Sequence, residues 1–248
     1  MSGAAEQRAG DGSHHRRAAE SGARLVLATR NLGKVRELRA MLAEDPDLAE
    51  AGWTRETLES AVVDAAALGC AEVPETGVTF TENSLLKARA VAEQTGVPAV
   101  ADDSGLAVDV LGGAPGIFSA RWAGAQASDA RNTALLLEQL IEVGPEHRSA
   151  AFVCAASLVT PQGAETTHLG RLEGTLLSAP QGDGGFGYDP ILQPLGEQRS
   201  CAELGMAEKN AISHRAKAFS ALRHDVVSVL LGRDVPGPRG GGLPGRPD

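Results

Sequence analysis

Aromatic residues are scarce in this sequence, in which phenylalanine, tyrosine and tryptophan make up 3% of 248 residues. The core must therefore be built mainly from alanine, valine and leucine, although the hydrophobic content of 42% is ordinary for a globular protein. Basic residues are also in deficit, since the formal net charge is −9. This charge argues against a nucleic-acid surface and against binding to acidic membranes. A small polyanionic substrate remains open if the site supplies local cations.

Cysteines and long apolar runs are scarce as well. Cys70, Cys154 and Cys201 form no Cys-x-x-Cys pair, so we expect buried free thiols in a reducing compartment rather than a zinc or redox site. No apolar run approaches the length of a membrane span, and the first 23 residues hold no hydrophobic segment typical of a secretory signal. We therefore expect a cytoplasmic protein without a membrane partner.

The two ends of the chain lack periodic apolar patterns. Residues 1–23 are rich in glycine, alanine, serine and charge, and residues 232–248 are rich in proline and glycine. Such compositions are typical of disorder. We predict a disordered N-terminal tail at 1–23, in which His14 and His15 are inert, one folded domain at 24–231, and a disordered C-terminal tail at 232–248.

Strand and helix patterns alternate between the tails. The patterns predict strands at 24–28, 98–101 and 105–111, helices at 34–44, 81–96, 128–143 and 212–232, and a hairpin of 150–160 with 164–174. Residues 44–73 fit either a helix or a strand, and we favour a strand near 61–63. The alternation indicates an α/β chain with a mixed sheet. Ligands in such sheets gather beyond strand ends.

The turn "TRNLGK" leads from the first predicted strand into a helix. Free backbone N–H groups at a helix start attract anions, Gly33 permits close approach, and Lys34 adds a positive charge. The turn is not a Walker A loop, because Lys34 is followed by Val35 rather than by serine or threonine. On this stretch alone, an ordinary helix start is the commoner interpretation.

The stretch "GDGGFGYDP" contains the spacing Gly-x-Gly-x-x-Gly but not its dinucleotide-binding context, which needs a strand before it and a helix after it. We interpret it as a loop that presents Phe186 beside Asp189. An aromatic face suits a stacked base, and a carboxylate suits ring N–H donors. The alternative is a glycine-rich turn with Phe186 in the core, which is favoured on this stretch alone.

The stretch "VADDSG" places Asp102 and Asp103 side by side, in a turn that we expect at a strand end. Mg²⁺ takes oxygen ligands, usually one or two carboxylates with substrate phosphates, and Glu75 from "PETG" is a further candidate. A solvated turn fits equally well when the pair is considered alone. "EKNAISHR" adds Lys209, His214 and Arg215 near the start of the last helix, where a solvated basic face is the alternative.

Together these pieces resemble one family, the inosine triphosphate pyrophosphatases, also called XTP/dITP diphosphatases. The resemblance is carried by "LATRNLGKVREL", "PETGVTFTENSLLKARA", "ADDSGLAVDVLGGAPGIFSARWAG", "GGFGYDPI" and "EKNAISHRAKA", in the family's order over about residues 24–231. It implies a mixed twisted sheet flanked by helices, with two lobes and the active-site cleft between them. It also implies Mg²⁺-dependent release of pyrophosphate from ITP, dITP and XTP by a cytoplasmic homodimer.

The resemblance also implies roles for individual residues. Asp103 would accept the proton of the attacking water and bind the metal with Glu75. Asp102 would support that charge cluster, and Lys87 would help neutralise the phosphates. Substrate would be bound by Thr29, Arg30, Asn31, Leu32, Gly33, Lys34, Ser104, Phe186, Gly187, Tyr188, Asp189, Lys209, His214 and Arg215. Arg30 departs from the family pattern, in which many relatives have a small residue. Two alternatives are a Maf-type pyrophosphatase of modified pyrimidine nucleotides and a nucleotide-binding sensor without turnover.

Overall fold

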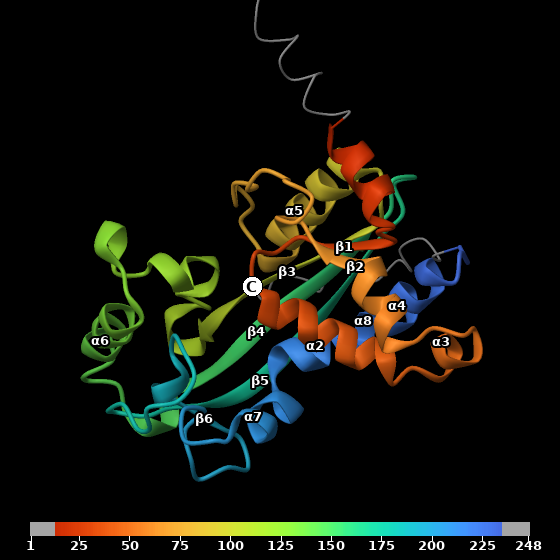
Figure 1. The fold of residues 1–248 in the computed structure, drawn as a ribbon. Helices are drawn as coiled ribbons and strands as arrows, with labels where there is room; N and C mark the ends of the chain where they lie inside the picture. The colour runs from red at the N-terminus through yellow and green to blue at the C-terminus, as the bar shows by residue number, and fades with distance from the viewer. Residues whose placement is uncertain (1–12, 235–248) are drawn as a thin grey trace, which may run out of the picture.

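A computed structural model describes residues 13–234, whose strands form one mixed sheet in the order β2-β1-β3-β4-β5-β6 (Figure 1). The strands are β1 (Leu25–Leu27), β2 (Val62–Asp64), β3 (Ala99–Val108), β4 (Ser149–Val159), β5 (Glu165–Leu176) and β6 (Leu192–Pro194). The first three run parallel to one another, and β3 to β6 pair in antiparallel fashion. The predicted α/β class with a mixed sheet is confirmed.

Helices cover both faces at the parallel end of the sheet (Figure 1). The α-helices are α2 (Leu32–Ala43), α3 (Pro46–Glu50), α4 (Arg55–Ala61), α5 (Phe80–Thr95), α6 (Asp129–Gln139), α7 (Met206–Ile212) and α8 (His214–Leu230). Helices α2, α4 and α8 share a core with Val100, whereas α5 packs on the other face with Ala99 and Ala101. Alternate residues of β3 therefore pack against different helices.

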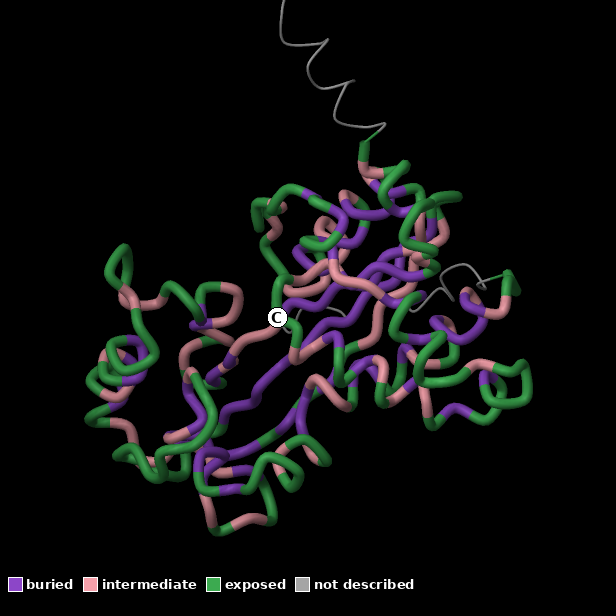
Figure 2. The backbone as a smooth tube through the Cα atoms, viewed as in Figure 1, coloured by how far each residue is buried: buried purple, intermediate pink, exposed green. Residues whose placement is uncertain are grey.

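A second lobe surrounds the far end of the long strands. Its core joins Leu106 of β3 to Leu136 of α6, and includes Phe152, Leu172 and Tyr188. Short 3₁₀ helices connect its segments: η1 (Asp109–Leu111), η2 (Gly116–Arg121), η3 (Gly124–Gln126), η4 (Pro145–His147) and η5 (Asp189–Ile191). Figure 2 shows the buried central strands running from one lobe into the other. The polar stretch of β3 lies between the two cores, as the two-lobe prediction requires.

The strand β3 corrects one prediction. Asp102 and Asp103 do not lie in a turn between two strands, because β3 continues through them from Ala99 to Val108. Its neighbour β4 pairs with every residue of this stretch in antiparallel register, so the chain does not turn there. The parallel partner β1 ends at Leu27, opposite Val100. The two aspartates therefore lie just past the end of β1, although they are inside β3.

Two ambiguous regions are also resolved. Residues 44–73 contain both helices and a strand, and β2 lies at Val62–Asp64 beside the favoured position. Disorder of the whole segment 1–23 is wrong for residues 13–21, which are helical, with Ala18 in the core beside α5. Residues 1–12 and 235–248 lie outside the described part of the chain. Lys209 lies in α7, before the last helix rather than at its start.

Candidate active site

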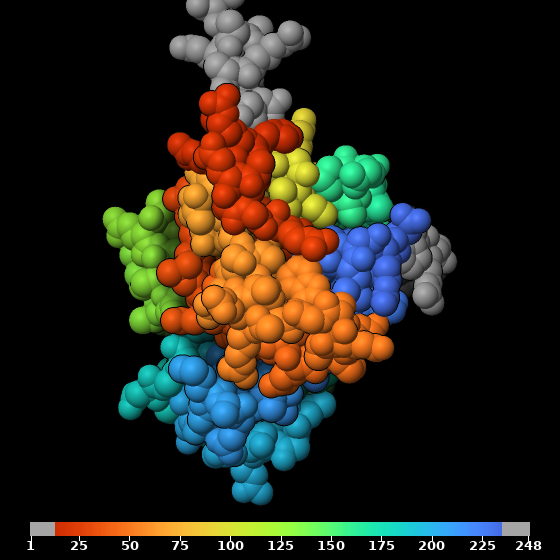
Figure 3. All heavy atoms as spheres, turned by 45° about the vertical axis from the view of Figure 1, so that its right-hand side comes forward, coloured from red at the N-terminus to blue at the C-terminus, as the bar shows by residue number. Residues whose placement is uncertain are grey.

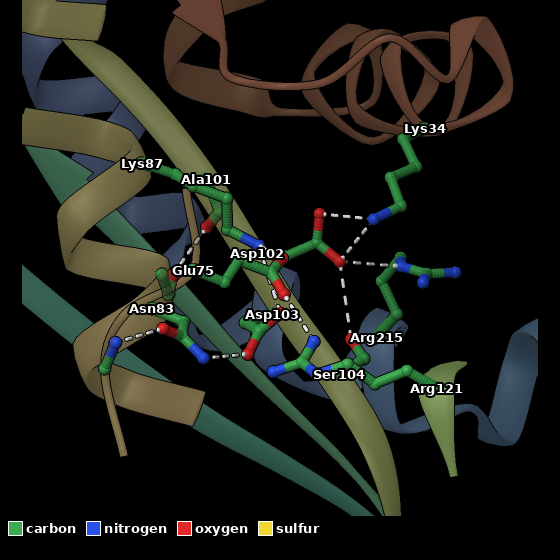
Figure 4. Close-up of polar contacts among 12 residues, drawn as sticks. Lys34, Glu75, Asn83, Lys87, Ala101, Asp102, Asp103, Ser104, Arg121 and Arg215 are labelled. Atoms are coloured by element: carbon green, nitrogen blue, oxygen red, sulfur yellow. Dashed lines mark hydrogen bonds and ion pairs between the residues drawn. The ribbon is translucent and has the colours of Figure 1, made fainter. Parts of the chain in front are cut away.

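Two adjacent aspartates stand at the centre of the site, on opposite faces of β3 (Figure 4). Successive side chains of a strand point to opposite sides of the sheet. Asp102 faces α2 and α8, where Lys34 Nζ donates to both of its oxygens at 2.7 Å. Asp103 faces α5, where Lys87 Nζ donates to Oδ1 at 3.0 Å. The two carboxylates therefore do not compete for one cation, since Asp102 pairs with Lys34 and Asp103 pairs with Lys87.

Asp102 is buried, and three groups donate to it. Besides Lys34, Arg215 Nε donates to Oδ2 at 3.3 Å and the Ser104 hydroxyl donates at 3.4 Å. Burial alone would raise the pKa of Asp102, but the Lys34 and Arg215 charges outweigh it and lower the pKa to about 2. Asp102 is therefore ionised at neutral pH, and it fixes the positions of both cations.

Asp103 has weaker partners and the opposite pKa shift. Burial raises its pKa above the ordinary value, although Lys87 and Asn83 Nδ2, which donates at 3.3 Å, act in the other direction. Lys87 also donates to Glu75 at 3.1 Å, and Arg121 lies 3.6 Å from the same glutamate. A carboxylate with a raised pKa accepts a proton more readily, which suits a general base.

Asp103 and Glu75 have the chemistry of a magnesium site. Their carboxylate oxygens converge on Lys87 Nζ, so they lie close together. Mg²⁺ is usually bound by one or two carboxylates together with phosphate oxygens and water. No group of three or more His, Cys, Asp or Glu side chains gathers into a metal site within residues 13–234. Asp103 and Glu75 are thus the two carboxylates that would hold a Mg²⁺ ion there.

The predicted phosphate turn adjoins a pocket. Asn31 begins α2 by accepting a hydrogen bond from Gly33 N at 2.8 Å, while the side chain of Lys34 turns inward to Asp102. A pocket of about 180 Å³ is lined by Thr29, Arg30, Glu75, Lys87 and residues 65–66 and 70–73, among others. Leu32 is exposed at the helix start.

The glycine-rich loop presents an aromatic ring, as the base-binding interpretation requires. Phe186 is 64% exposed, and Lys209 Nζ lies 4.8 Å from its ring centroid. Asp189 accepts hydrogen bonds from Lys209 and from the backbone of Phe186, while Gly187 N donates to Asp129. Tyr188 differs from its neighbours, because its ring is buried and its hydroxyl donates to a backbone carbonyl at 2.9 Å. The loop is not a strand-to-helix turn, so rejection of the dinucleotide motif is confirmed.

His214 opens α8 beside Arg215 and is buried against Phe152, with ring centroids 5.1 Å apart. Burial and the nearby Arg215 and Lys209 charges lower the pKa of His214 to about 3, so the ring is neutral. Its Nδ1 is buried without a hydrogen-bond partner within the described residues. A buried polar atom of this kind is costly unless a ligand completes it.

The structure brings Lys34, Ser104 and Arg215 together around Asp102, and Phe186 and Lys209 together around Asp189. It also adds two residues to the candidate site. Asn83 and Arg121 contact the acidic pair or Glu75, and both lie in the quoted stretches "FTENSLLKARA" and "FSARWAG". Both residues thus lie in stretches that carry the family resemblance. A single asparagine or arginine does not indicate a role in a site, however, until the side chains that it contacts are known. Buried free thiols are confirmed for all three cysteines. No helix within residues 13–234 is long and apolar enough to cross a membrane.

The mixed sheet and its cation-lined cleft define an α/β protein with a site suited to a highly charged anion. The chain belongs to the Ham1 family, whose model matches residues 25–225. It is 60% identical to a dITP/XTP pyrophosphatase of Streptomyces coelicolor over 209 residues, or 84% of this chain and 99% of the relative. It is 48% identical to a dITP/XTP pyrophosphatase of Mycobacterium tuberculosis, over 84% of this chain and 98% of the relative.

Two solved structures have the same fold. A HAM1 protein from Coxiella burnetii superposes with a TM-score of 0.72 at 37% identity, covering 85% of this chain and 99% of that protein. A nucleoside-triphosphatase / dITP/XTP pyrophosphatase from Mycobacterium abscessus superposes with a TM-score of 0.66 at 46% identity, covering 80% of this chain and 97% of that protein.

Proposed function

We propose that this protein hydrolyses the deaminated purine nucleoside triphosphates ITP, dITP and XTP to the monophosphate and pyrophosphate. The charge cluster around β3 carries the proposal. Four cations, Lys34, Lys87, Arg121 and Arg215, pair there with the three carboxylates Asp102, Asp103 and Glu75. One formal positive charge is left over, which favours an anionic ligand. The named relatives act on the same substrate class.

Asp103 is the proposed general base. It lies beside the pocket, its pKa is raised by burial, and Lys87 orients one of its oxygens. It would take a proton from the water that attacks the α-phosphorus. Lys34, fixed by Asp102, would stabilise the charge that develops on the phosphoryl oxygens. Bound Mg²⁺, with Asp103 and Glu75 as ligands, would neutralise further phosphate charge.

The metal assignment predicts a specific defect in Glu75→Gln. Loss of one carboxylate ligand should raise the Mg²⁺ concentration needed for half-maximal activity about tenfold or more. Loss of a group that only hydrogen-bonds to a metal ligand already lowers metal affinity by about 10- to 100-fold, and Glu75 would be a direct ligand. The measurement is pyrophosphate release across a Mg²⁺ titration. Glu72→Gln is the matched control, since Glu72 lines the same pocket but no contact joins it to Asp103. Equal Mg²⁺ requirements in the two variants would contradict the assignment.

The base would lie against Phe186, within reach of Asp189, Lys209, His214 and Arg215. The exposed ring supplies a stacking face. Arg215 contacts Asp102 through Nε alone, which leaves its two terminal nitrogens for the C6 keto oxygen of inosine or xanthosine. Adenine has an amino group at C6, so it would place a donor against these donors.

Arg215→Ala should therefore lose part of the preference for ITP over ATP. One unpaired buried polar group costs about 1–3 kcal/mol, so the ratio of kcat/KM values should fall by about 5- to 150-fold. The measurement is pyrophosphate release from each nucleotide under the same conditions. Arg223→Ala is the control, because Arg223 lies on the same helix but pairs with Asp45 at 3.4 Å, away from the cleft. An unchanged ratio in Arg215→Ala would refute this account of base choice.

We also propose a cytoplasmic homodimer. The three buried free cysteines support a reducing compartment, and the dimer rests on the family resemblance. Light scattering of the purified protein tests the dimer, since a mass near 25.5 kDa would be that of the monomer.

A substrate panel tests the proposed function itself. Pyrophosphate release is measured from ITP, XTP, ATP and GTP, each with Mg²⁺ and with chelator. Metal-dependent release mainly from ITP and XTP is the expected result. If no purine nucleotide releases pyrophosphate, modified pyrimidine triphosphates are assayed next, and release from them would favour the Maf-type alternative. Tight nucleotide binding without turnover would favour a sensor.

A further inference from the structure

The helix at residues 13–21, hereafter the N-terminal helix, lies outside the stretch that the Ham1 family model matches. It is nevertheless packed on the domain. Ala18 is 1% exposed and shares a core cluster with Ala65, Leu68 and Cys70. Figure 3 shows the red N-terminal segment lying across the orange and yellow segments at the top of the molecule. The helix is thus an addition to the family domain with a defined docking site.

Two glycines allow the helix to lie this close. Gly69 and Gly96 both have positive φ, and a Cβ on Gly96 would lie 2.6 Å from the His15 ring. A Cβ on Gly69 would collide with the Arg17 guanidinium. His14 Nδ1 donates to the Leu68 carbonyl at 3.1 Å. Side chains of His14, His15 and Arg17 thus reach the 65–70 turn and the end of α5.

These contacts reach residues of the pocket described above. Ala65, Ala66 and Cys70 line the same pocket as Glu75 and Lys87. Ala65 and Cys70 also belong to the core cluster that contains Ala18, so the helix packs on residues that form the pocket wall. The C-terminal end of α5, which Gly96 closes, belongs to the helix that carries Lys87.

We propose that the N-terminal helix is a positioning element for the pocket, holding the 65–70 wall in the place where it meets the terminal phosphates of the substrate. The proposal rests on the proposed function for the identity of the ligand. Without the helix, a wall made largely of alanine would lose its packing on one side. The wall would then open locally, which weakens substrate binding more than it slows the chemical step.

Ala18→Glu tests the proposal by placing a charge in the docking site. Ala19→Glu is the matched control, because Ala19 is the next residue and is exposed. A second pair removes residues 1–21 or only residues 1–12. Two readouts are used for each: the split between KM and kcat with ITP, and the rate at which a maleimide labels Cys70, located by mass spectrometry. In Cys70→Ser the labelling attributed to Cys70 should disappear, which identifies that signal, since Cys154 and Cys201 are buried elsewhere.

In Ala18→Glu and in the chain without residues 1–21, Cys70 should be labelled about tenfold faster, because labelling follows the population of the open wall. KM should rise about three- to tenfold with kcat within about twofold. Both controls should match the parent. Wild-type labelling and KM in Ala18→Glu would overturn the proposal, and so would a lower melting temperature alone. If the shorter chain does not fold, the Ala18 and Ala19 pair decides. Labelling requires no turnover, so it separates this proposal from the proposed function.

Discussion

Replacement of Asp103 by asparagine is expected to abolish pyrophosphate release while the fold stays intact. The amide has nearly the same shape as the carboxylate but cannot take a proton from water, and removal of a general base typically costs about 10²–10⁴-fold in rate. It also removes a carboxylate from the candidate metal site. Because burial raises the pKa of Asp103, its charge is held at a cost, and a neutral side chain should not destabilise the protein. The measurements are kcat with ITP and the thermal unfolding midpoint.

Asp109→Asn is the control for this substitution. Asp109 follows the end of β3 directly and is exposed, so the same chemical change occurs close by without touching the site. Its kcat and unfolding midpoint should both match the parent. Parent-like turnover in Asp103→Asn would remove Asp103 from the reaction altogether.

Asp102→Asn should differ from Asp103→Asn by causing a large loss of stability. The pKa of Asp102 falls to about 2 in the folded protein, and this preference for the ionised form corresponds to about 2–3 kcal/mol. Asparagine would leave Lys34 and Arg215 without their shared anion in a largely buried setting. The measurement is the free energy of unfolding in urea at pH 7, with Asp103→Asn as the matched comparison.

The same shift fixes the pH dependence. A carboxyl group with a lowered pKa in the folded state stabilises the protein above its ordinary pKa, and the contribution is lost as pH falls toward the folded value. The stabilisation by Asp102 is thus complete above about pH 4–5 and declines toward pH 2. The stability difference between parent and Asp102→Asn should shrink over this window. A difference that is small at pH 7, or constant down to pH 2, would show that the ion pairs do not stabilise the fold.

Much of the fold follows from local pattern. The sequence predicts a helix at 81–96, and the structure shows it at Phe80–Thr95, where Thr79 rather than Thr81 caps the start and Gly96 closes the end. The hairpin of β4 and β5 was equally readable from two apolar runs around a short turn. The continuity of β3 could not be predicted from local pattern. Two adjacent aspartates are typical of a turn, and the pairing with β4 that keeps them in a strand is a long-range contact.

The arrangement of the candidate site could not be predicted from the sequence. Sequence pattern and family resemblance named Lys34, Asp102 and Arg215, but their pairing depends on segments brought together only by folding. Neither pattern nor resemblance distinguishes the exposed Phe186 from the buried Tyr188 two residues later. The helix around Ala18 was missed because its composition resembles that of a tail, and only a contact with the domain orders it.

Because Asp102 and Asp103 point to opposite faces of β3, the register of β3 against β4 decides which helix each carboxylate meets. Asp102 lies opposite Ala156 and Asp103 opposite Ala155. A slip of one residue would turn every β3 side chain to the other face of the sheet. The proposed base would then point to Lys34, while the structural anion would point to Lys87. A misregistered chain would keep its sequence and its strands but would lose both its stability and its catalytic activity. The formation of the active site thus depends on the correct register of β3 with β4.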